Sequence, residues 1–436
     1  MREMKNSGVE WIGEIPGEWI RTSLLNVLST KISDGPHETP ILLDKGIPFI
    51  SVDSLNNSES IDFSVVKKFI SEEDYLRYYK KASLTKGDIL FSKAATIGKT
   101  AIVGDEKFMV WSPIAIIKTN MSRCNNKYIY YILNCSGLIK QISLMGSHNT
   151  QINVGMRELE KVQIPVPSLP EQHRIADFLD EKCAKIDAVI EKQKQVIEKL
   201  KEYKLSVITE AVTKGLDPIA PMKDSGVEWI GEIPEEWNLV KLKYAINKIG
   251  DIDHYMPESV DEGIPYLMTG DLKENVSSIN FNACKKVSAE DYQALCKKMS
   301  TQKGDIIFAR YATIGTVAYV DVECDFLVSY SCVTIRVNKR KLNGKYLFFY
   351  LKSKTFFEEV KKYINANTQG NVGIDSLNKV RMPLPPIDTQ KTVVDYIERK
   401  SNEIDLAIAK KQVIVEKLTE YKKSLIYEVV TGKREV

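Results

Sequence analysis

The sequence predicts an α/β (α+β) fold in two copies: two mixed globular domains joined by two long antiparallel helices that form a coiled coil, with a pseudo-twofold internal repeat. The first observation is a decapeptide, SGVEWIGEIP, that occurs at residues 7–16 and again at 225–234 of the 436-residue chain. The second is a heptad pattern of apolar residues near the end of each half. The third is a mixture of strand-like and helix-like segments between these two markers.

The duplication continues from the decapeptide to the end of each half, at an offset of 217 or 218 residues. Further matches are KGDILF at 86–91 with KGDIIF at 303–308, ATIG at 95–98 and 312–315, and NTQ at 149–151 and 367–369. The stretches between these matches differ strongly. We therefore expect a shared framework that carries diverged loops.

Each globular part is predicted to mix short helices with strands. Ser71 and Ser288 each begin a capping-box pattern, which predicts a helix start at both positions. Longer patterns predict strands at Val110–Ile117 and Leu327–Val337 and helices at Lys127–Ser143 and Lys345–Tyr363. The aromatic residues on those two helices are interpreted as core.

A heptad pattern of apolar residues follows the globular part in each half. The helix–helix seam is predicted to contain Leu179, Ile186, Leu200, Val207, Ile397, Ile404, Leu418 and Leu425. The pseudo-twofold repeat predicts that the two helices pair antiparallel, seam to seam. The alternative is that each helix packs only on its own globular domain. The predicted division is a globular domain at 1–167, a helix at 168–215, a second globular domain at 216–385 and a helix at 386–436.

Composition places the chain among cytoplasmic proteins without a membrane segment. The longest apolar runs, such as Ile114–Ile117, are far shorter than the roughly 20 residues that a membrane span needs. The start of the chain lacks the apolar core of a signal peptide. Seven scattered Cys without a C-x-x-C pair favour reduced thiols. A net charge of +3 neither supports nor excludes nucleic-acid binding, since a local basic surface would suffice.

The sequence indicates no catalytic site, no bound cofactor and no metal. Gly98-Lys99-Thr100 resembles the end of a phosphate-binding loop, but the first glycine of that motif is replaced by Lys93. In the second copy the corresponding residues are Gly315-Thr316-Val317, so the lysine of the motif is absent there. The Asn/Asp-Pro-Pro-aromatic loop of amino-group methyltransferases is missing, and no His, Cys or Asp cluster has metal-ligand spacing. These features predict a non-catalytic recognition protein.

The repeated order of these motifs resembles the specificity subunits of Type I restriction–modification systems. The motifs that carry the resemblance are the decapeptide with Trp19, residues 86–91 with 95–98, the NTQ triplet, and the Pro-Val-Pro-x-x-x-x-Gln run from Pro165 to Gln172. All of them recur in the second half, so the resemblance covers essentially the whole chain.

The resemblance implies that residues 1–167 and 216–385 are target recognition domains, each reading one half of an asymmetric bipartite sequence in double-stranded DNA. The helices at 168–215 and 386–436 would be the conserved spacers that set the gap and dock two methyltransferase subunits. Restriction subunits would join this complex, which acts in phage defence. S-adenosylmethionine and ATP with Mg²⁺ would be bound by those partners and not by this chain.

Matched basic residues are the first candidates for DNA contact. Lys93 and Arg310, the latter followed by Tyr311, occupy equivalent places after a predicted strand. A cation there suits a phosphate or a guanine edge, although a solvated charge at a strand end is an equal alternative. His37 and His254 also correspond, each three residues before a proline. They are candidates for DNA contact or for a structural role in a turn.

Two amide-rich loops are the other candidates, because amides pair well with adenine edges and phosphates. The residues are Ser147, Asn149, Thr150 and Gln151 in the first half and Asn367, Thr368 and Gln369 in the second. The same residue types also stabilise ordinary turns.

A competing function is a coiled-coil scaffold whose two globular heads bind proteins. The modest net charge and the balanced charges of the helices are compatible with it.

Overall fold

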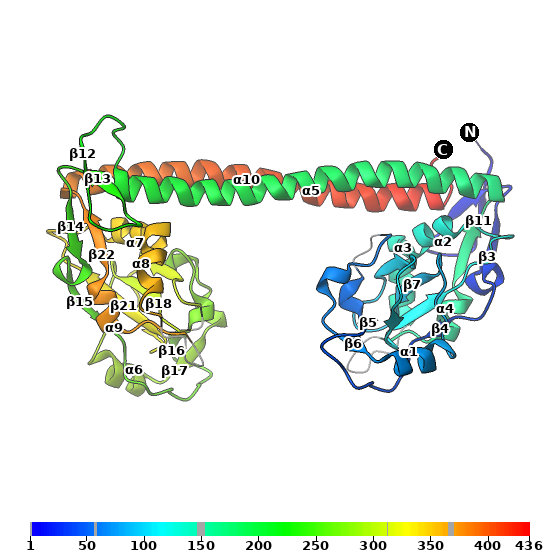
Figure 1. Ribbon diagram of the computed structural model, residues 1–436, viewed down its shortest axis with the longest axis horizontal. Helices are drawn as coiled ribbons and strands as arrows, with labels where there is room; N and C mark the ends of the chain where they lie inside the picture. The colour runs from blue at the N-terminus through cyan, green and yellow to red at the C-terminus, as the bar shows by residue number, and fades with distance from the viewer. Residues whose placement is uncertain (1, 56–58, 146–152, 312, 365–369) are drawn as a thin grey trace. The chain divides into compact units, whose positions relative to one another are not determined.

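The chain forms two compact units in the computed structural model, which describes residues 2–55, 59–145, 153–311, 313–364 and 370–436. Unit 1 comprises Met1–Gln193 together with Val413–Val436, and unit 2 comprises Lys194–Gln412. Each unit contains one globular head and segments of both long helices (Figure 1).

The head of unit 1 is built on a four-stranded antiparallel sheet. Its strand order is β4 (Ser33–Asp34), β10 (Ile114–Ile117), β7 (Ile89–Ser92) and β8 (Thr100–Ile102). A second sheet has the order β6 (Phe69–Ile70), β5 (Ile47–Ile50) and β9 (Met109–Val110), with β5 and β9 parallel. Two further pairs are β1 (Met4–Asn6) with β2 (Glu14–Pro16), and β3 (Ile20–Ser23) with β11 (Gln163–Val166).

Among its described residues this head contains four short α-helices: α1 (Glu72–Tyr79), α2 (Asn126–Leu133), α3 (Ser136–Met145) and α4 (Met156–Lys161). The predicted start of α1 is confirmed, because the Ser71 hydroxyl accepts a hydrogen bond from the Asp74 backbone N–H at 3.0 Å. Every residue of β7 and β10 is buried, which places the four-stranded sheet inside the core.

The head of unit 2 repeats this topology. The four-stranded sheet is β15 (Ile246–Gly250), β21 (Cys332–Val337), β18 (Ile306–Ala309) and β19 (Val317–Tyr319). The three-stranded sheet is β17 (Lys285–Val287), β16 (Ile264–Leu267) and β20 (Leu327–Val328). The two-stranded pairs are β12 (Met222–Asp224) with β13 (Glu232–Pro234) and β14 (Asn238–Lys241) with β22 (Arg381–Leu384). The helices are α6 (Ala289–Cys296), α7 (Gly344–Lys352), α8 (Lys354–Lys361) and α9 (Ile374–Lys379).

The long patterns predicted as single elements are each divided in two. The strand predicted at Val110–Ile117 is wrong as one element, because the chain turns between β9 and β10 and Pro113 has no N–H to continue a ladder. Leu327–Val337 divides likewise into β20 and β21 around a turn in which Cys332 N–H donates to Ser329 O. The helix predicted at Lys345–Tyr363 ends and restarts at Ser353, whose hydroxyl caps α8.

The helix predicted at Lys127–Ser143 is also two helices, α2 and α3. Asn134 ends α2, and Ser136 begins α3. Residue periodicity alone could not detect this interruption, because buried apolar residues continue on both sides of it.

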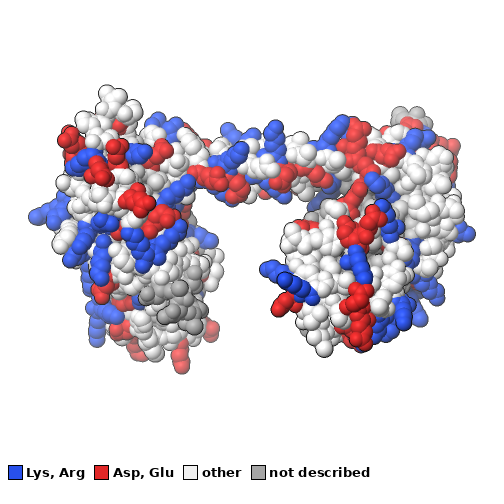
Figure 2. Space-filling view, in the orientation of Figure 1, with Lys and Arg blue, Asp and Glu red and all other residues white. Residues whose placement is uncertain are grey.

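The two long helices are confirmed as α5 (Leu169–Lys214) and α10 (Ile387–Val430). Lys and Arg side chains are interspersed with Asp and Glu side chains on the visible surface of the long helices (Figure 2). Each unit receives the beginning of one long helix and the end of the other.

In unit 1 the start of α5 packs antiparallel against the end of α10. Asp187 on α5 pairs with Lys422 on α10 at 2.6 Å. Sixteen residues earlier on α5, Glu171 shares the Arg2 side chain with Glu435, which lies beyond the end of α10. Moving back along α5 thus means moving forward along α10.

In unit 2 the end of α5 packs in the same antiparallel way against the start of α10. Lys204 pairs with Asp405 at 2.7 Å. The Tyr346 hydroxyl lies 3.0 Å from Val212 O near the end of α5 and 3.1 Å from Pro383 O just before α10. Tyr128 makes the equivalent contacts in unit 1, to Pro165 O at 2.8 Å and Val430 O at 3.3 Å.

The eight predicted seam residues differ in burial. Leu179, Ile186, Val207, Ile397, Ile404 and Leu425 are buried, whereas Leu200 and Leu418 are half-buried. Several seam residues also contact the heads, since Leu179 and Leu425 belong to the core of unit 1 and Ile397 to that of unit 2. The helices therefore pair with each other and pack on the heads at the same time.

Candidate nucleic-acid interface

Two strands of the four-stranded sheet bring the first candidate residues of unit 1 to one edge. β4 and β7 both run antiparallel to β10, which lies between them, so their carboxyl ends meet at the same edge. β4 ends at Asp34, and Lys93 directly follows β7. The Lys93 ammonium lies 3.2 Å from Asp34 Oδ2. His37 Nε2 lies 3.2 Å from the same oxygen.

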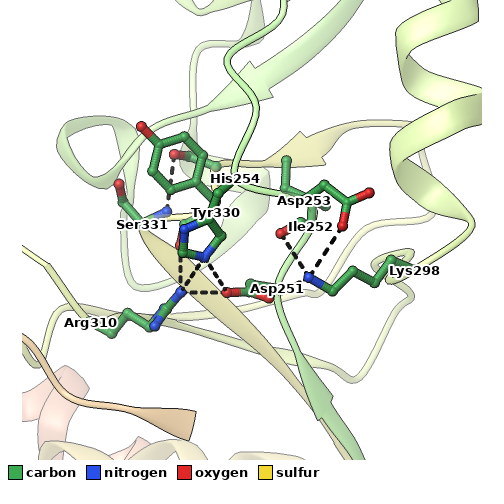
Figure 3. Close-up of polar contacts among 9 residues, drawn as sticks. Asp251, Ile252, Asp253, His254, Lys298, Arg310, Tyr330 and Ser331 are labelled. Carbon is green, nitrogen blue, oxygen red and sulfur yellow. Dashed lines mark hydrogen bonds and ion pairs between the residues drawn. The ribbon is translucent and has the colours of Figure 1, made fainter.

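The same cluster recurs in unit 2, at the edge where β15 and β18 end (Figure 3). Arg310 donates hydrogen bonds to the Asp251 carboxylate and to Tyr330 O, the second at 3.2 Å. His254 Nε2 lies 3.2 Å from Asp251 Oδ2, and its ring stacks on Tyr330 at a centroid distance of 5.1 Å. We call Asp34, His37 and Lys93, and likewise Asp251, His254 and Arg310, the carboxylate–histidine–cation clusters.

Lys298 adds a second cation to the cluster of unit 2. Its ammonium lies 3.2 Å from Asp251 Oδ1 and 3.4 Å from the Asp253 carboxylate (Figure 3). Burial raises the pKa of Asp251, but the hydrogen bond from Lys298 and the charge of Arg310 outweigh it, so the pKa lies below its ordinary value. Asp251 is thus held as a carboxylate that binds two cations.

Burial separates the members of each cluster. Lys93 is 7% exposed and Arg310 6%, and both point at a carboxylate. The side chains of His37 and His254 are 74% and 57% exposed. The histidines are therefore the members that a ligand at this edge would meet first. A direct base contact by Lys93 or Arg310 stays a prediction, and it would require these cations to leave their carboxylates.

The sequence did not single out Asp34, Asp251 or Lys298. A signal was present, because both clusters use the spacing Asp-x-x-His, at 34–37 and 251–254, with the offset of 217. Lys298 corresponds to Lys81, which lines a groove of about 590 Å³ together with Asp34 and His37. The matched lysine thus lies beside the matched cluster in both units.

The turn after β7 holds Lys93 by an unusual backbone conformation. Ala95 has a φ of +62° and Gly98 a φ of +90°. Ser92 Oγ accepts a hydrogen bond from Lys99 N–H at 2.8 Å, which closes the turn. In unit 2, a Cβ on the equivalent Gly315 would lie 2.3 Å from Phe357, so only glycine fits there. The glycine shared by the two Ala-Thr-Ile-Gly motifs, Gly98 and Gly315, therefore serves to shape this turn.

The residues that follow the amide-rich loops lie beside the clusters. Val154 N–H donates to Lys93 O at 2.9 Å, and Val372 N–H donates to Arg310 O at 3.1 Å. Tyr311 is half-buried, pairs with Asn371 across a β-bridge and lies under the Arg310 guanidinium at 4.8 Å. The predicted residues Ser147, Asn149, Thr150, Gln151, Asn367, Thr368 and Gln369 lie outside the described part of the chain. Their predicted contacts with DNA stay predictions.

Two further observations concern the described residues only. No group of three or more His, Cys, Asp or Glu side chains among them is arranged to hold a metal ion. None of the helices described there combines the length and apolar character that crossing a membrane demands.

Comparison with known proteins places both halves in one family. The model of the Type I restriction modification DNA specificity domain matches residues 37–199 and 234–416, which is more than half of the chain. The chain belongs to this family. Each matched segment of the specificity-domain fold contains the histidine and the cation of one cluster.

Curated relatives agree with the family over nearly the full length. The Type I restriction enzyme MjaVIII specificity subunit of Methanocaldococcus jannaschii is 23% identical, covering 88% of this chain and 85% of its own. The EcoBI specificity subunit of Escherichia coli is 21% identical, covering 91% and 82%. A solved structure from work on complex assembly and conformational transition of the Type I R-M system has a TM-score of 0.69 at 14% identity, covering 96% of this chain and 99% of its own.

Membership of the specificity-domain family gives the function in its general form: the chain recognises DNA target sequences. The family implies recognition and not catalysis. The solved structure, at its low identity, supports the fold alone.

Proposed function

We propose that each head reads one half of an asymmetric bipartite target in double-stranded DNA, and that the edge carrying the carboxylate–histidine–cation cluster faces the DNA. The observation that carries this proposal is the matched pair of clusters, built from equivalent strand ends in the two units. Their surroundings differ, since the segment after Asp34 reads GPHETP and that after Asp251 reads IDHYMP. Because the side chains that contact base edges determine the sequence that is read, two heads with the same framework and different loops are expected to read different half-sites.

We propose that α5 and α10 set the gap between the half-sites and dock two methyltransferase subunits. Tyr203 on α5 and Tyr421 on α10 are equivalent residues and are 55% and 50% exposed. Exposed tyrosines are favoured at protein interfaces. Restriction subunits would join this complex in the cytoplasm. S-adenosylmethionine and ATP with Mg²⁺ would be bound by those partners, while this chain binds no cofactor.

Exchange of one head tests this proposal directly. Replacing residues 1–167 by the corresponding domain of another family member should change one half of the methylated target and leave the other half unchanged. The measurement is sequencing of the adenines methylated by the complex of the chimera with its methyltransferase subunits. A simultaneous change of both half-sites would contradict the one-head, one-half-site arrangement.

Alanine at His37 or His254 should weaken binding of the complex to its cognate duplex by about 1–3 kcal/mol, the usual contribution of a good base contact. The control is His173→Ala, because His173 lies on α5 and contacts Asn125 instead of the cluster. Affinity is measured at several salt concentrations, since phosphate contacts make it fall with salt. Unchanged affinity in both variants would remove the histidines from the interface. Binding without salt dependence would favour the protein-binding scaffold.

Lys93→Ala and Arg310→Ala are expected to weaken binding by a similar amount if these cations reach base edges. Each variant also breaks a buried ion pair. Because this loss can unfold the head, the folded state of each variant is measured together with its affinity for DNA.

A further inference from the structure

In unit 1 the Arg2 side chain fills a site formed by three carboxylates. Arg2 donates a hydrogen bond to Glu171, and its Nε lies 3.1 Å from Glu435 and 3.5 Å from Glu18. Glu171 is buried and also accepts a hydrogen bond from Trp19 Nε1 at 3.1 Å. The Glu171 carboxylate thus binds both the Arg2 guanidinium and the Trp19 indole N–H.

The equivalent position in unit 2 lacks both of these groups. Strand pairing anchors the correspondence, because Met4 pairs with Pro16 in unit 1 and Met222 pairs with Pro234 in unit 2. At the offset of 218, Ala220 replaces Arg2. The equivalent of Glu171 is Thr389, while Glu236 and Trp237 retain the chemistry of Glu18 and Trp19. Unit 2 therefore keeps part of an arginine-binding site without the arginine.

A cavity of about 670 Å³ lies at this position in unit 2. Its lining includes Glu236, Trp237, Thr389 and Ala220. Trp237 is 4% exposed, and within the described part of the chain its indole N–H has no hydrogen-bond partner of the kind that Glu171 gives Trp19. The cavity is thus lined by an aromatic side chain as well as by carboxylates.

The charge of this cavity is acidic. Asp217, Glu235, Glu236 and Asp388 line it, against a single basic residue, Lys214. Asp388 pairs with Lys391 at 2.9 Å, whereas the other three carboxylates form no ion pair among the described residues. Such a surface repels phosphates and attracts cations. Leu216 and Pro221 contribute apolar wall, and the neighbouring Ile219 is 88% exposed.

We propose that this cavity, the Ala220 pocket, receives an arginine side chain from a methyltransferase subunit docked on unit 2. The inference rests on the proposed function, which brings that subunit to these helices. Arginine fits because its planar guanidinium binds carboxylates through several hydrogen bonds and packs on aromatic faces. The matched site of unit 1 holds an arginine on a carboxylate equivalent to Glu236, which is the arrangement that the pocket would reproduce.

The test fills the pocket from within by Ala220→Arg in the full chain. Binding of the cognate methyltransferase subunit is measured by titration calorimetry, with complex mass determined in parallel. We expect affinity at unit 2 to fall at least tenfold, because the new side chain occupies the site. Thermal unfolding checks that the variant remains folded. Unchanged affinity in a folded Ala220→Arg chain would overturn the proposal.

A second variant removes charge without adding bulk. Glu236→Gln should also weaken methyltransferase binding, whereas the matched variant Glu18→Gln, whose carboxylate serves Arg2, should not. Equal effects of the two variants, or no effect of Glu236→Gln, would overturn the assignment of an arginine. Failure of the proposed function would look different, because the unmodified chain with its methyltransferase subunits would then give no sequence-specific methylation.

Discussion

The fragment Lys194–Gln412 is expected to fold alone, whereas Met1–Gln193 is expected to remain unfolded without residues 413–436. The reason is connectivity, since unit 2 is a continuous segment and unit 1 is assembled from two separate ones. The main core of unit 2 lies entirely between Ile208 and Ile397. The main core of unit 1 joins residues 9–186 with Leu425, Ile426, Val429 and Val430.

The expected size of the effect follows from the four buried side chains on the end of α10. Burying each aliphatic side chain contributes roughly 1.5–3 kcal/mol, so their joint loss is comparable to the roughly 5–15 kcal/mol that stabilises a typical domain. Tyr128 would also lose its contact with Val430 O. Circular dichroism and hydrogen exchange of the two fragments measure the difference.

A fused fragment provides the control for this prediction. Arg2 contacts Glu435 at 3.1 Å, so a short Gly/Ser linker can join residue 436 to residue 2. A chain running 413–436, linker and 2–193 should fold, and the same chain carrying Val429→Asp should not. Folding of Met1–Gln193 without any part of α10 would contradict the assembly of unit 1 from two segments.

Replacing Asp251 by Ala is expected to destabilise unit 2 by about 3–5 kcal/mol, the usual cost of removing one partner of a buried ion pair. Arg310 is 6% exposed and would keep its charge without the carboxylate. The matched control is Asp253→Ala. Asp253 also pairs with Lys298, but its side chain is 67% exposed, so its loss should cost less than about 1 kcal/mol.

The pH dependence of this difference supplies a second check. The pKa of Asp251 is lowered in the folded state, so its carboxylate stabilises unit 2 fully above the unfolded pKa of about 4. That contribution disappears as the pH falls through the lower, folded pKa. Denaturant unfolding of the wild type and Asp251→Ala should therefore differ at pH 7 and converge in strong acid. Equal stability at pH 7 would show that the ion pair is dispensable.

Local patterns predicted the start of α1 and the two long helices, because a capping serine and a heptad act over a few residues. They missed the interruptions at Asn134 and Ser353, where apolar periodicity continues across the break. They named the histidines and cations of the clusters separately. Only the sheet showed that Asp34 and Asp251 join them, since a shared carboxylate depends on strand order.

The duplication and the helical heptads were determined by the sequence alone, because identical residues at a fixed offset build identical local structure. The tertiary structure decided which helix end covers each head. Tyr128 reaches Val430 across 302 residues, and such a contact depends on packing and not on any local pattern. It likewise decided that Ala220 lines a pocket, because only folding brings Ala220, Trp237 and Thr389 together.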